Sequence, residues 1–233
     1  MTLKKQLIKK INNVNFWIFD LDNTIYNSNL KLFPQVQKRI GKFVSNYLDI
    51  NITEAEKIQK KFFFKYKSTL KGLMNEHNMK PDKFLDFVHD IDYSILKPDK
   101  EFDFLLDQLP GKKYIYTNGS TKHAINVLEH MNISNHFLGV FDIKDANFEP
   151  KPDMDSMKSF INKFSINVEN ALMAEDMAIN LEPPHKLGIK TLLVQTEYNW
   201  NKEKNLDFID FKTDDLQGWL RNIIKINLIN NKY

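Results

Sequence analysis

The sequence contains no cysteine among its 233 residues. This absence excludes a disulfide framework, thiolate catalysis and a zinc site with cysteine ligands. No apolar run approaches the roughly 20 residues that a membrane-spanning helix needs, and residues 1–11 lack the apolar core and cleavage site of a secretory signal. An excess of one charge is also missing, because 33 basic residues stand against 30 acidic ones, for a net charge of +3. We therefore expect a cytoplasmic protein with neither nucleic acid nor a membrane as its partner.

Apolar residues make up 42% of the chain, enough to bury a sizeable core as one large domain or as a domain with an insertion. After residue 112 short buried strands alternate with amphipathic helices, which predicts a parallel sheet with helices on both faces. The chain is therefore expected to have an α/β fold with a Rossmann-like core. The expected strands span residues 16–19, 113–116, 140–143, 171–174 and 191–194.

Between residues 28 and 100 the pattern is helical, without convincing strands. Pro34 suits a first helical turn, Thr53 with Glu56 forms a capping-box pattern, and Pro81 opens a further helix. His89, near the end of this region, is expected to be a surface or packing residue. We therefore expect a helical cap inserted into the α/β core.

The expected division assigns residues 1–27 and 101–233 to the core and residues 28–100 to the cap. The cap is rich in aromatic residues, and the run Phe62-Phe63-Phe64 is expected mainly to pack between its helices.

Polar side chains follow the expected strands at the point where each strand ends. Asp20 and Asp22 follow the first strand, Asp176 follows a later one, and Lys151 lies in a loop between a strand and a helix. Because the carboxyl ends of parallel strands meet at one edge of a sheet, these residues can converge there. Three carboxylates need a compensating cation, and hard oxygen ligands favour Mg²⁺. The lysine and the backbone amides of the turn Thr117-Asn118-Gly119 complement an anionic substrate, which indicates phosphoryl transfer.

At this point the sequence resembles the haloacid dehalogenase-like hydrolases. Asp20-Leu21-Asp22-Asn23-Thr24 matches their DxDxT signature, and their three further motifs match Thr117-Asn118-Gly119, Lys151-Pro152 and Glu175-Asp176 in the same order. The helical region lies where one type of cap is inserted in this family. More narrowly, residues 17–26, 69–74 and 88–92 are similar to stretches of bacterial pyrimidine 5′-nucleotidase-type members.

The resemblance implies a catalytic set of four residues. Asp20 is the expected nucleophile that forms an aspartyl-phosphate, as carboxylates do in covalent phosphoryl transfer. Asp22 is expected to protonate the leaving oxygen and then to act as a base toward water. Thr117 and Lys151 complete the set by holding the phosphoryl group and neutralising its charge.

The resemblance also implies where Mg²⁺ and phosphate bind. The metal ligands are expected to be Asp20, the backbone carbonyl of Asp22, and Asp176. The phosphate ligands are expected to be Thr117, Asn118, Gly119 and Lys151. The implied activity is a Mg²⁺-dependent hydrolysis of phosphomonoesters, with pyrimidine nucleoside monophosphates as the expected substrates.

Two positions depart from the family pattern. Many relatives have Ser just after the metal-binding acid and another acid a few residues on, where this chain has Met177 and Asn180. Metal affinity is the property these changes affect, and Glu175 is expected to compensate as a supporting acid.

Several alternatives stay open. The chain could hydrolyse a sugar phosphate or another small metabolite, or act as a phospho-acceptor signalling module without turnover, or bind ligands without catalysis. The same core also supports phosphosugar mutation and dehalogenation, of which dehalogenation is disfavoured because it does not need Asp22. The sequence does not decide the physiological substrate, the cap residues that contact the leaving group, or the oligomeric state.

Overall fold

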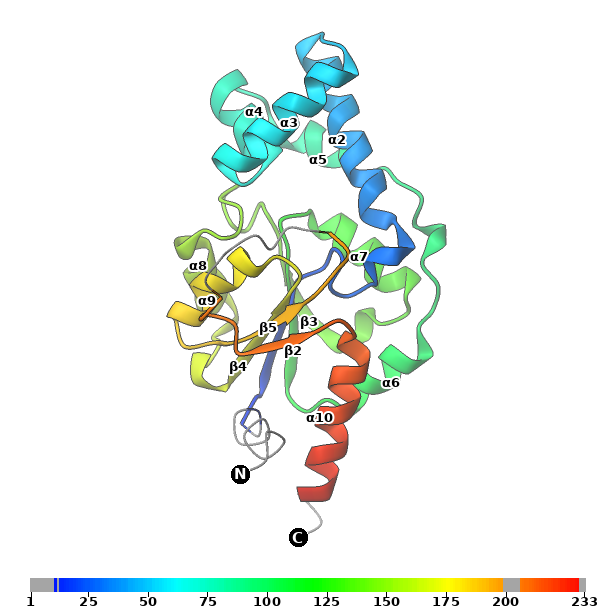
Figure 1. The fold of residues 1–233 in the computed structure, drawn as a ribbon, viewed down its shortest axis with the longest axis vertical. Helices are drawn as coiled ribbons and strands as arrows, with labels where there is room; N and C mark the ends of the chain where they lie inside the picture. The colour runs from blue at the N-terminus through cyan, green and yellow to red at the C-terminus, as the bar shows by residue number, and fades with distance from the viewer. Residues whose placement is uncertain (1–10, 12, 199–205, 231–233) are drawn as a thin grey trace.

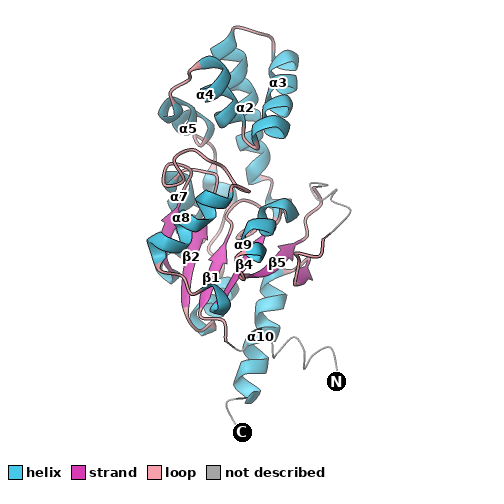
Figure 2. Cartoon of the chain, turned by 90° about the vertical axis from the view of Figure 1, so that its left-hand side faces the viewer, coloured by secondary structure: helices cyan, strands magenta, loops and turns pink. Residues whose placement is uncertain are grey.

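The computed structural model describes residues 11, 13–198 and 206–230, the last five of them by their backbone only. Within them, six strands form one parallel sheet of order β3-β2-β1-β4-β5-β6 (Figures 1 and 2). The strands are β1 (Phe16–Phe19), β2 (Lys112–Tyr116), β3 (Phe137–Phe141), β4 (Ala171–Glu175), β5 (Lys190–Val194) and β6 (Phe211–Thr213). Four of the expected strands are confirmed to within one residue at each end, and there are two larger differences. The strand expected at 140–143 begins at Phe137 and ends at Phe141, and β6 was not expected.

Side chains of β1 alternate between the two faces of the sheet, as the period of an extended chain requires. Trp17 and Phe19 belong to one apolar cluster, and Ile18 belongs to a second cluster on the opposite face. Because both clusters are buried, the strand is apolar without interruption, which is typical of a parallel sheet. The Rossmann-like α/β architecture is thus confirmed.

Helices cover both faces of the sheet. The face of Trp17 packs against α6 (Lys100–Gln108), α7 (Thr121–His130) and α10 (Leu216–Asn230). The face of Ile18 packs against α8 (Met154–Phe164), and against residues around α9 (Glu182–Lys186). Five short 3-10 helices are described: Ser28–Leu30, Tyr93–Ile95, Ser134–His136, Val168–Asn170 and Ala178–Leu181.

Four helices stand together beyond the carboxyl ends of the strands (Figures 1 and 2). They are α2 (Leu32–Leu48), α3 (Ile52–Tyr66), α4 (Thr69–His77) and α5 (Pro81–Val88), and they share an apolar cluster of their own. Phe62 is buried in that cluster, as expected, whereas Phe64 is exposed. The capping box expected at Thr53 is wrong: α3 begins at Ile52, and its N-cap is Asn51, whose side chain accepts a hydrogen bond from the amide of Glu54.

We propose the same division into a core of residues 1–27 and 101–233 and a cap of residues 28–100. The separate cluster of α2–α5 supports it, although Leu32, Tyr93 and Leu96 pack with the cluster of the sheet. Most of the lead-in at residues 1–11 lies outside the described residues, but Ile11 is buried. Among the helices described, none has both the length and the apolar character needed to cross a membrane.

Candidate active site

The backbone ladder of the sheet continues past the strand ends into the candidate site. The amide of Asp20 donates to the carbonyl of Ala174 at 2.9 Å, and the amide of Thr117 donates to the carbonyl of Phe141 at 3.0 Å. These bonds fix the first residue after β1 and the first residue after β2. Asp20 therefore stands at the carboxyl end of a central strand, beside the point where the strand order reverses, which is where open α/β sheets bind ligands.

Lys151 lies at the centre of this edge. Its Nζ donates to Asp20 Oδ1 at 2.6 Å, to Glu175 Oε2 at 2.7 Å and to the carbonyl of Tyr116 at 3.0 Å. Its own amide donates to Asn118 Oδ1 at 2.8 Å. Burial lowers the pKa of the Lys151 amine, but the carboxylates of Asp20 and Glu175 outweigh burial and hold this pKa above its ordinary value. Lys151 is therefore a buried, charged residue whose position is fixed at both ends.

Asp20, Glu175 and Asp176 form a buried acidic cluster, with one oxygen of each lying within 4.8 Å of the others. Burial, and then the charge of Glu175, raises the pKa of Asp20 to about 7. Burial and the same neighbour raise the pKa of Asp176 well above its ordinary value. Three carboxylates against one Lys151 ammonium leave two negative charges, which a divalent cation would balance. The donor set consists of hard oxygen atoms, so these residues fit a metal such as Mg²⁺.

Asp22 lies in different surroundings, and its carboxylate is not part of that cluster. Its Oδ1 accepts from Tyr26 Oη at 2.6 Å and lies 2.9 Å from Nε2 of His123. Burial raises the pKa of Asp22, but the charge of His123 and the hydrogen bonds of His123 and Tyr26 outweigh burial and hold it below its ordinary value. The expected metal contact of Asp22 is through its backbone carbonyl, and it stays a prediction.

The turn Thr117-Asn118-Gly119 is closed by its own hydrogen bond. Thr117 Oγ1 accepts from the amide of Gly119 at 2.9 Å, and a hydroxyl that accepts in this way can still donate its hydrogen to a phosphoryl oxygen. A Cβ at Gly119 would lie 3.2 Å from Cδ2 of His123 and 3.3 Å from Thr117 Oγ1. A side chain at this position would therefore press on both groups. The Asn118 side chain orients Lys151, and the phosphate contacts expected of this turn stay predictions.

The residues around Asp22 were not predicted from the sequence. His123 is fully buried near the start of α7, and Tyr26 is buried four residues after Asp22. His89, expected to be a surface or packing residue, lies with its ring stacked on His123. One signal for His123 was present in the sequence, since it directly precedes Ala124 in an amphipathic segment that follows an expected strand.

The two departures from the family pattern lie directly behind the acidic cluster. The amide of Met177 donates to Glu175 Oε1 at 3.2 Å, and Asn180 is buried in the 3-10 helix that follows. Glu175 thus binds Lys151 with one oxygen and the backbone after β4 with the other. Its expected role as a supporting acid stays a prediction.

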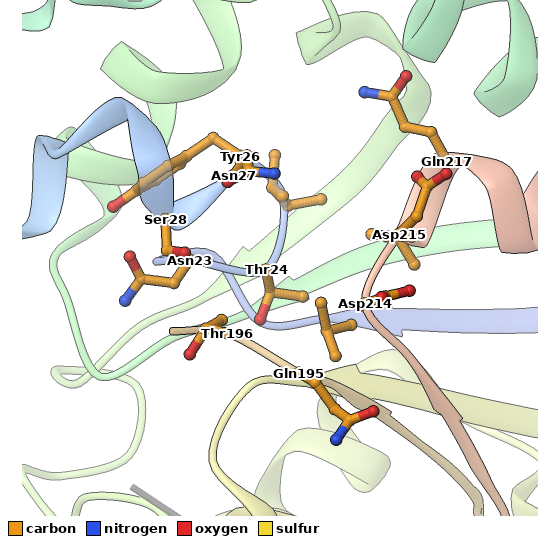
Figure 3. Close-up of a pocket in the computed structure, with 13 residues that line it drawn as sticks. Asn23, Thr24, Tyr26, Asn27, Ser28, Gln195, Thr196, Asp214, Asp215 and Gln217 are labelled. Carbon is orange, nitrogen blue, oxygen red and sulfur yellow. The ribbon is translucent and has the colours of Figure 1, made fainter. Parts of the chain in front are cut away.

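Two cavities border the site. One, of about 90 Å³, lies between the turn after Asp22, the end of β5 and the start of α10 (Figure 3). Asn23 Oδ1 and Thr24 Oγ1 are buried there, without a hydrogen-bond partner among the described residues, so water is their natural partner. The other, of about 150 Å³, lies between α5 and α7 and is bordered by His89, Tyr93 and Ser120.

Comparison with known families accounts for this arrangement. The model of the family described as haloacid dehalogenase-like hydrolase matches residues 17–194, which include all four motif segments. The chain belongs to the haloacid dehalogenase-like hydrolase family. Among curated proteins, this hydrolase is similar to phosphate metabolism protein 8 of Saccharomyces cerevisiae. The two are 26% identical over 235 residues, which cover 91% of this chain and 71% of the yeast protein.

Solved structures share the fold at low sequence identity. CbbY from Rhodobacter sphaeroides, solved in complex with phosphate, has a TM-score of 0.62 at 12% identity, covering 87% of this hydrolase and 94% of CbbY. The HAD-hydrolase YfnB from Bacillus subtilis, solved bound to magnesium, has a TM-score of 0.58 at 15% identity, with coverages of 90% and 98%. L-2-haloacid dehalogenase from Xanthobacter autotrophicus has a TM-score of 0.54 at 15% identity, with coverages of 89% and 97%.

Proposed function

We propose that this hydrolase cleaves phosphomonoesters in a Mg²⁺-dependent reaction through an aspartyl-phosphate on Asp20. The observation that carries the proposal is the contrast between two acids of one motif. Asp20 is bound by Lys151 inside the acidic cluster, whereas Asp22 is bound by Tyr26 and His123 outside it. Two carboxylates in such different surroundings suit two different roles, a nucleophile and an acid–base group.

In the first step an oxygen of Asp20 attacks phosphorus, and the bond from phosphorus to the leaving oxygen breaks. Its electron pair goes to that oxygen, which takes a proton from Asp22. Thr117 donates to a phosphoryl oxygen, and Lys151 offsets negative charge on Asp20 and on the phosphoryl group. These groups are fixed before the substrate arrives, so the site has little reorganisation left to make.

In the second step water attacks phosphorus, Asp22 takes a proton from that water, and the bond between Asp20 and phosphorus breaks. Asp22 must therefore hold a proton at one stage and lose it at another. Its pKa lies below the ordinary value in the substrate-free protein. A bound phosphate dianion beside Asp22 raises that pKa, because a neighbouring negative charge disfavours the carboxylate.

Mg²⁺ bound by Asp20, Asp176 and the backbone carbonyl of Asp22 would supply positive charge for the phosphoryl oxygens. The residual charge of the acidic cluster supports this assignment, and the YfnB structure was solved bound to magnesium. We expect EDTA to abolish phosphate release and added Mg²⁺ to restore it. An unchanged rate in EDTA would contradict the metal assignment.

The proposed substrates are small phosphomonoesters, and among them pyrimidine nucleoside 5′-monophosphates. The groups at the strand ends bind the phosphoryl group and the metal, which are common to the hydrolysis of every phosphomonoester. Selectivity between substrates must therefore come from the cap. The cap is rich in aromatic side chains, which can stack on a flat base. The resemblance of residues 17–26, 69–74 and 88–92 to pyrimidine 5′-nucleotidase-type members supports this choice.

A substrate panel tests the proposal. Phosphate release is measured from UMP, CMP, AMP, GMP, several sugar phosphates and p-nitrophenyl phosphate, with and without Mg²⁺. We expect the highest kcat/KM on UMP or CMP. A preference for a sugar phosphate would overturn the nucleotide assignment and leave the phosphatase assignment standing. Stoichiometric labelling of Asp20 without turnover would instead identify a phospho-acceptor module.

A further inference from the structure

The carboxylate of Asp22 is held through only one of its two oxygens. Tyr26 Oη, at 2.6 Å, and His123 Nε2, at 2.9 Å, both contact Oδ1. Within the part of the chain that the structure describes, no hydrogen bond reaches Oδ2, and 17% of the Asp22 side chain is exposed. One oxygen is thus anchored, and the other remains open to the site.

The orientation of His123 is fixed by Tyr93. Tyr93 Oη lies 2.8 Å from Nδ1 of His123 and 3.0 Å from the backbone carbonyl of His89. A carbonyl can only accept, so the Tyr93 hydroxyl donates to it and accepts from Nδ1–H of His123. This geometry directs Nδ1–H of His123 to Tyr93 and Nε2 to Asp22 Oδ1.

The plane of the His123 ring is fixed by His89. The two imidazoles stack with their centroids 4.4 Å apart and their planes 7° from parallel. His89 Nδ1 in turn lies 2.9 Å from Ser120 Oγ, which also accepts from the amide of His123 as the N-cap of α7. Burial, and then the charge of His123, lowers the pKa of His89 to about 3, so His89 stacks as a neutral ring.

These supports come from outside the four motifs. His89 and Tyr93 lie in the segment between α5 and α6 that leads the chain from the cap helices to the core. Tyr93 packs with the apolar cluster of the sheet. The position of Asp22 therefore depends on how the segment leaving the cap is seated on α7.

We propose that His123, oriented by Tyr93 and His89, is the positioning residue that aims Oδ2 of Asp22 at the leaving oxygen of the substrate. This inference rests on the proposed phosphomonoesterase function. His123 does not touch the substrate. When the bond from phosphorus to oxygen breaks, the proton passes from Asp22 to the leaving oxygen. A displaced Asp22 protonates that oxygen less effectively in the transition state. The cost depends on how much the leaving group needs that proton.

Leaving groups of different acidity test this dependence. In the whole chain carrying His123→Leu, kcat/KM is measured for p-nitrophenyl phosphate, whose phenolate leaves readily, and for glycerol 2-phosphate, whose alkoxide needs a proton. We expect a loss of about a hundredfold on the alkyl ester and of less than about threefold on the aryl ester. Because kcat/KM covers only the steps up to release of the alcohol, hydrolysis of the shared intermediate does not enter the comparison.

A matched control and a double mutant complete the experiment. His136→Leu removes another histidine that pairs with an aspartate, since its Nε2 lies 2.6 Å from Asp103 Oδ1, away from the site. Both esters should react with this variant as they do with the wild type. In an Asp22→Asn background, His123→Leu should not lower kcat/KM for the alkyl ester further, because the acid that His123 positions is already absent.

The inference would be overturned if His123→Leu lowered kcat/KM equally for the two esters. It would also be overturned if His123→Leu lowered kcat/KM by its full factor in the Asp22→Asn background. Either result would leave the proposed function standing. Release of phosphate from neither ester by the wild type would overturn both. If His123→Leu fails to fold, Tyr93→Phe replaces it in the test. We expect Tyr93→Phe to lower kcat/KM about tenfold for the alkyl ester and to leave the aryl ester unaffected. Its control is Tyr47→Phe, which removes a hydroxyl 3.3 Å from the carbonyl of His77 within the cap.

Discussion

Lys151 and Asp20 meet through a contact of 2.6 Å between Nζ and Oδ1, although they lie 131 positions apart in the sequence. The same Nζ lies 2.7 Å from Glu175 Oε2, and the lysine side chain is only 3% exposed. A cation buried between two carboxylates is an obligatory partner for both of them, since either charge alone would be expensive to bury. This relationship makes Lys151 a determinant of stability as well as a candidate catalytic group.

Lys151→Met should lower the free energy of unfolding by roughly 3 kcal/mol, because it leaves the acidic cluster without its ammonium partner. Urea denaturation without divalent ions measures the loss, and Mg²⁺ should recover part of it. Lys163→Met is the control, because Lys163 pairs with Asp145 at the surface and should contribute less than about 1 kcal/mol. Equal effects of the two substitutions would contradict a stabilising role for the buried pair.

Asp20→Asn should lower turnover by at least about a thousandfold, because the nucleophile of the proposed scheme is removed. The fold should remain, and thermal stability in EDTA should not fall, since the substitution relieves repulsion with Glu175 and Asp176. Phosphate release and circular dichroism measure the two properties. Asp82→Asn, at an exposed carboxylate of the cap, should keep full activity. Turnover by a folded Asp20→Asn variant close to that of the wild type would rule out the covalent scheme.

The sequence was most informative where structure is decided locally. The buried strands and the helix start at Pro81, where α5 begins, follow from neighbouring residues and were predicted. β6 was missed because it has three residues and none is fully buried. The start of α3 was misplaced because Asn51 and Thr53 are both suitable caps two positions apart, and only the packing of the helix selects between them.

The sequence predicted which residues lie at the same edge of the sheet, but not the contacts between distant elements. Because the carboxyl ends of parallel strands share one edge, Asp20, Thr117, Lys151 and Asp176 could be placed there from the sequence. The contact of His123 with Asp22 joins residues 101 positions apart through a helix and a turn, so it depends on how α7 seats on the sheet. No local pattern encodes that seating, and the residues around Asp22 had to come from the structure.

Asp142 should make stability depend on pH. Its carboxylate accepts from the amide and hydroxyl of Thr121 and from the amides of Lys144 and Asp145. Burial raises the pKa of Asp142, but these hydrogen bonds outweigh burial and hold it below its ordinary value. A lowered pKa means stabilisation that is present above the ordinary value near 4 and lost as the pH falls through the folded-state value. Asp142→Asn should therefore cost about 2 kcal/mol at neutral pH and progressively less below about pH 4.

Denaturant unfolding of the wild type and Asp142→Asn at several pH values measures this difference. Asp155→Asn is a suitable control, because its carboxylate is largely exposed and pairs with Lys158 one turn away. A destabilisation by Asp142→Asn that stays constant from neutral pH to about pH 3 would show that the charge of Asp142 does not matter.

Two glycines in the cap helices should respond in opposite ways to alanine. A Cβ on Gly72 in α4 would lie 2.3 Å from Cγ and 2.6 Å from Cβ of Phe62, whose buried ring cannot move aside. A Cβ on Gly41 in α2 would lie nearest to the flexible end of Gln59, at 3.3 Å, and at ordinary contact distances from Ile52 and Glu56. Alanine favours a helix over glycine by up to about 1 kcal/mol, so Gly41→Ala should leave the protein as stable or more stable. Gly72→Ala should lose about 1–3 kcal/mol through overpacking, measured as urea unfolding and as faster amide exchange in α3 and α4. Similar stability of the two variants would show that α3 and α4 pack less closely than the contact between Gly72 and Phe62 indicates.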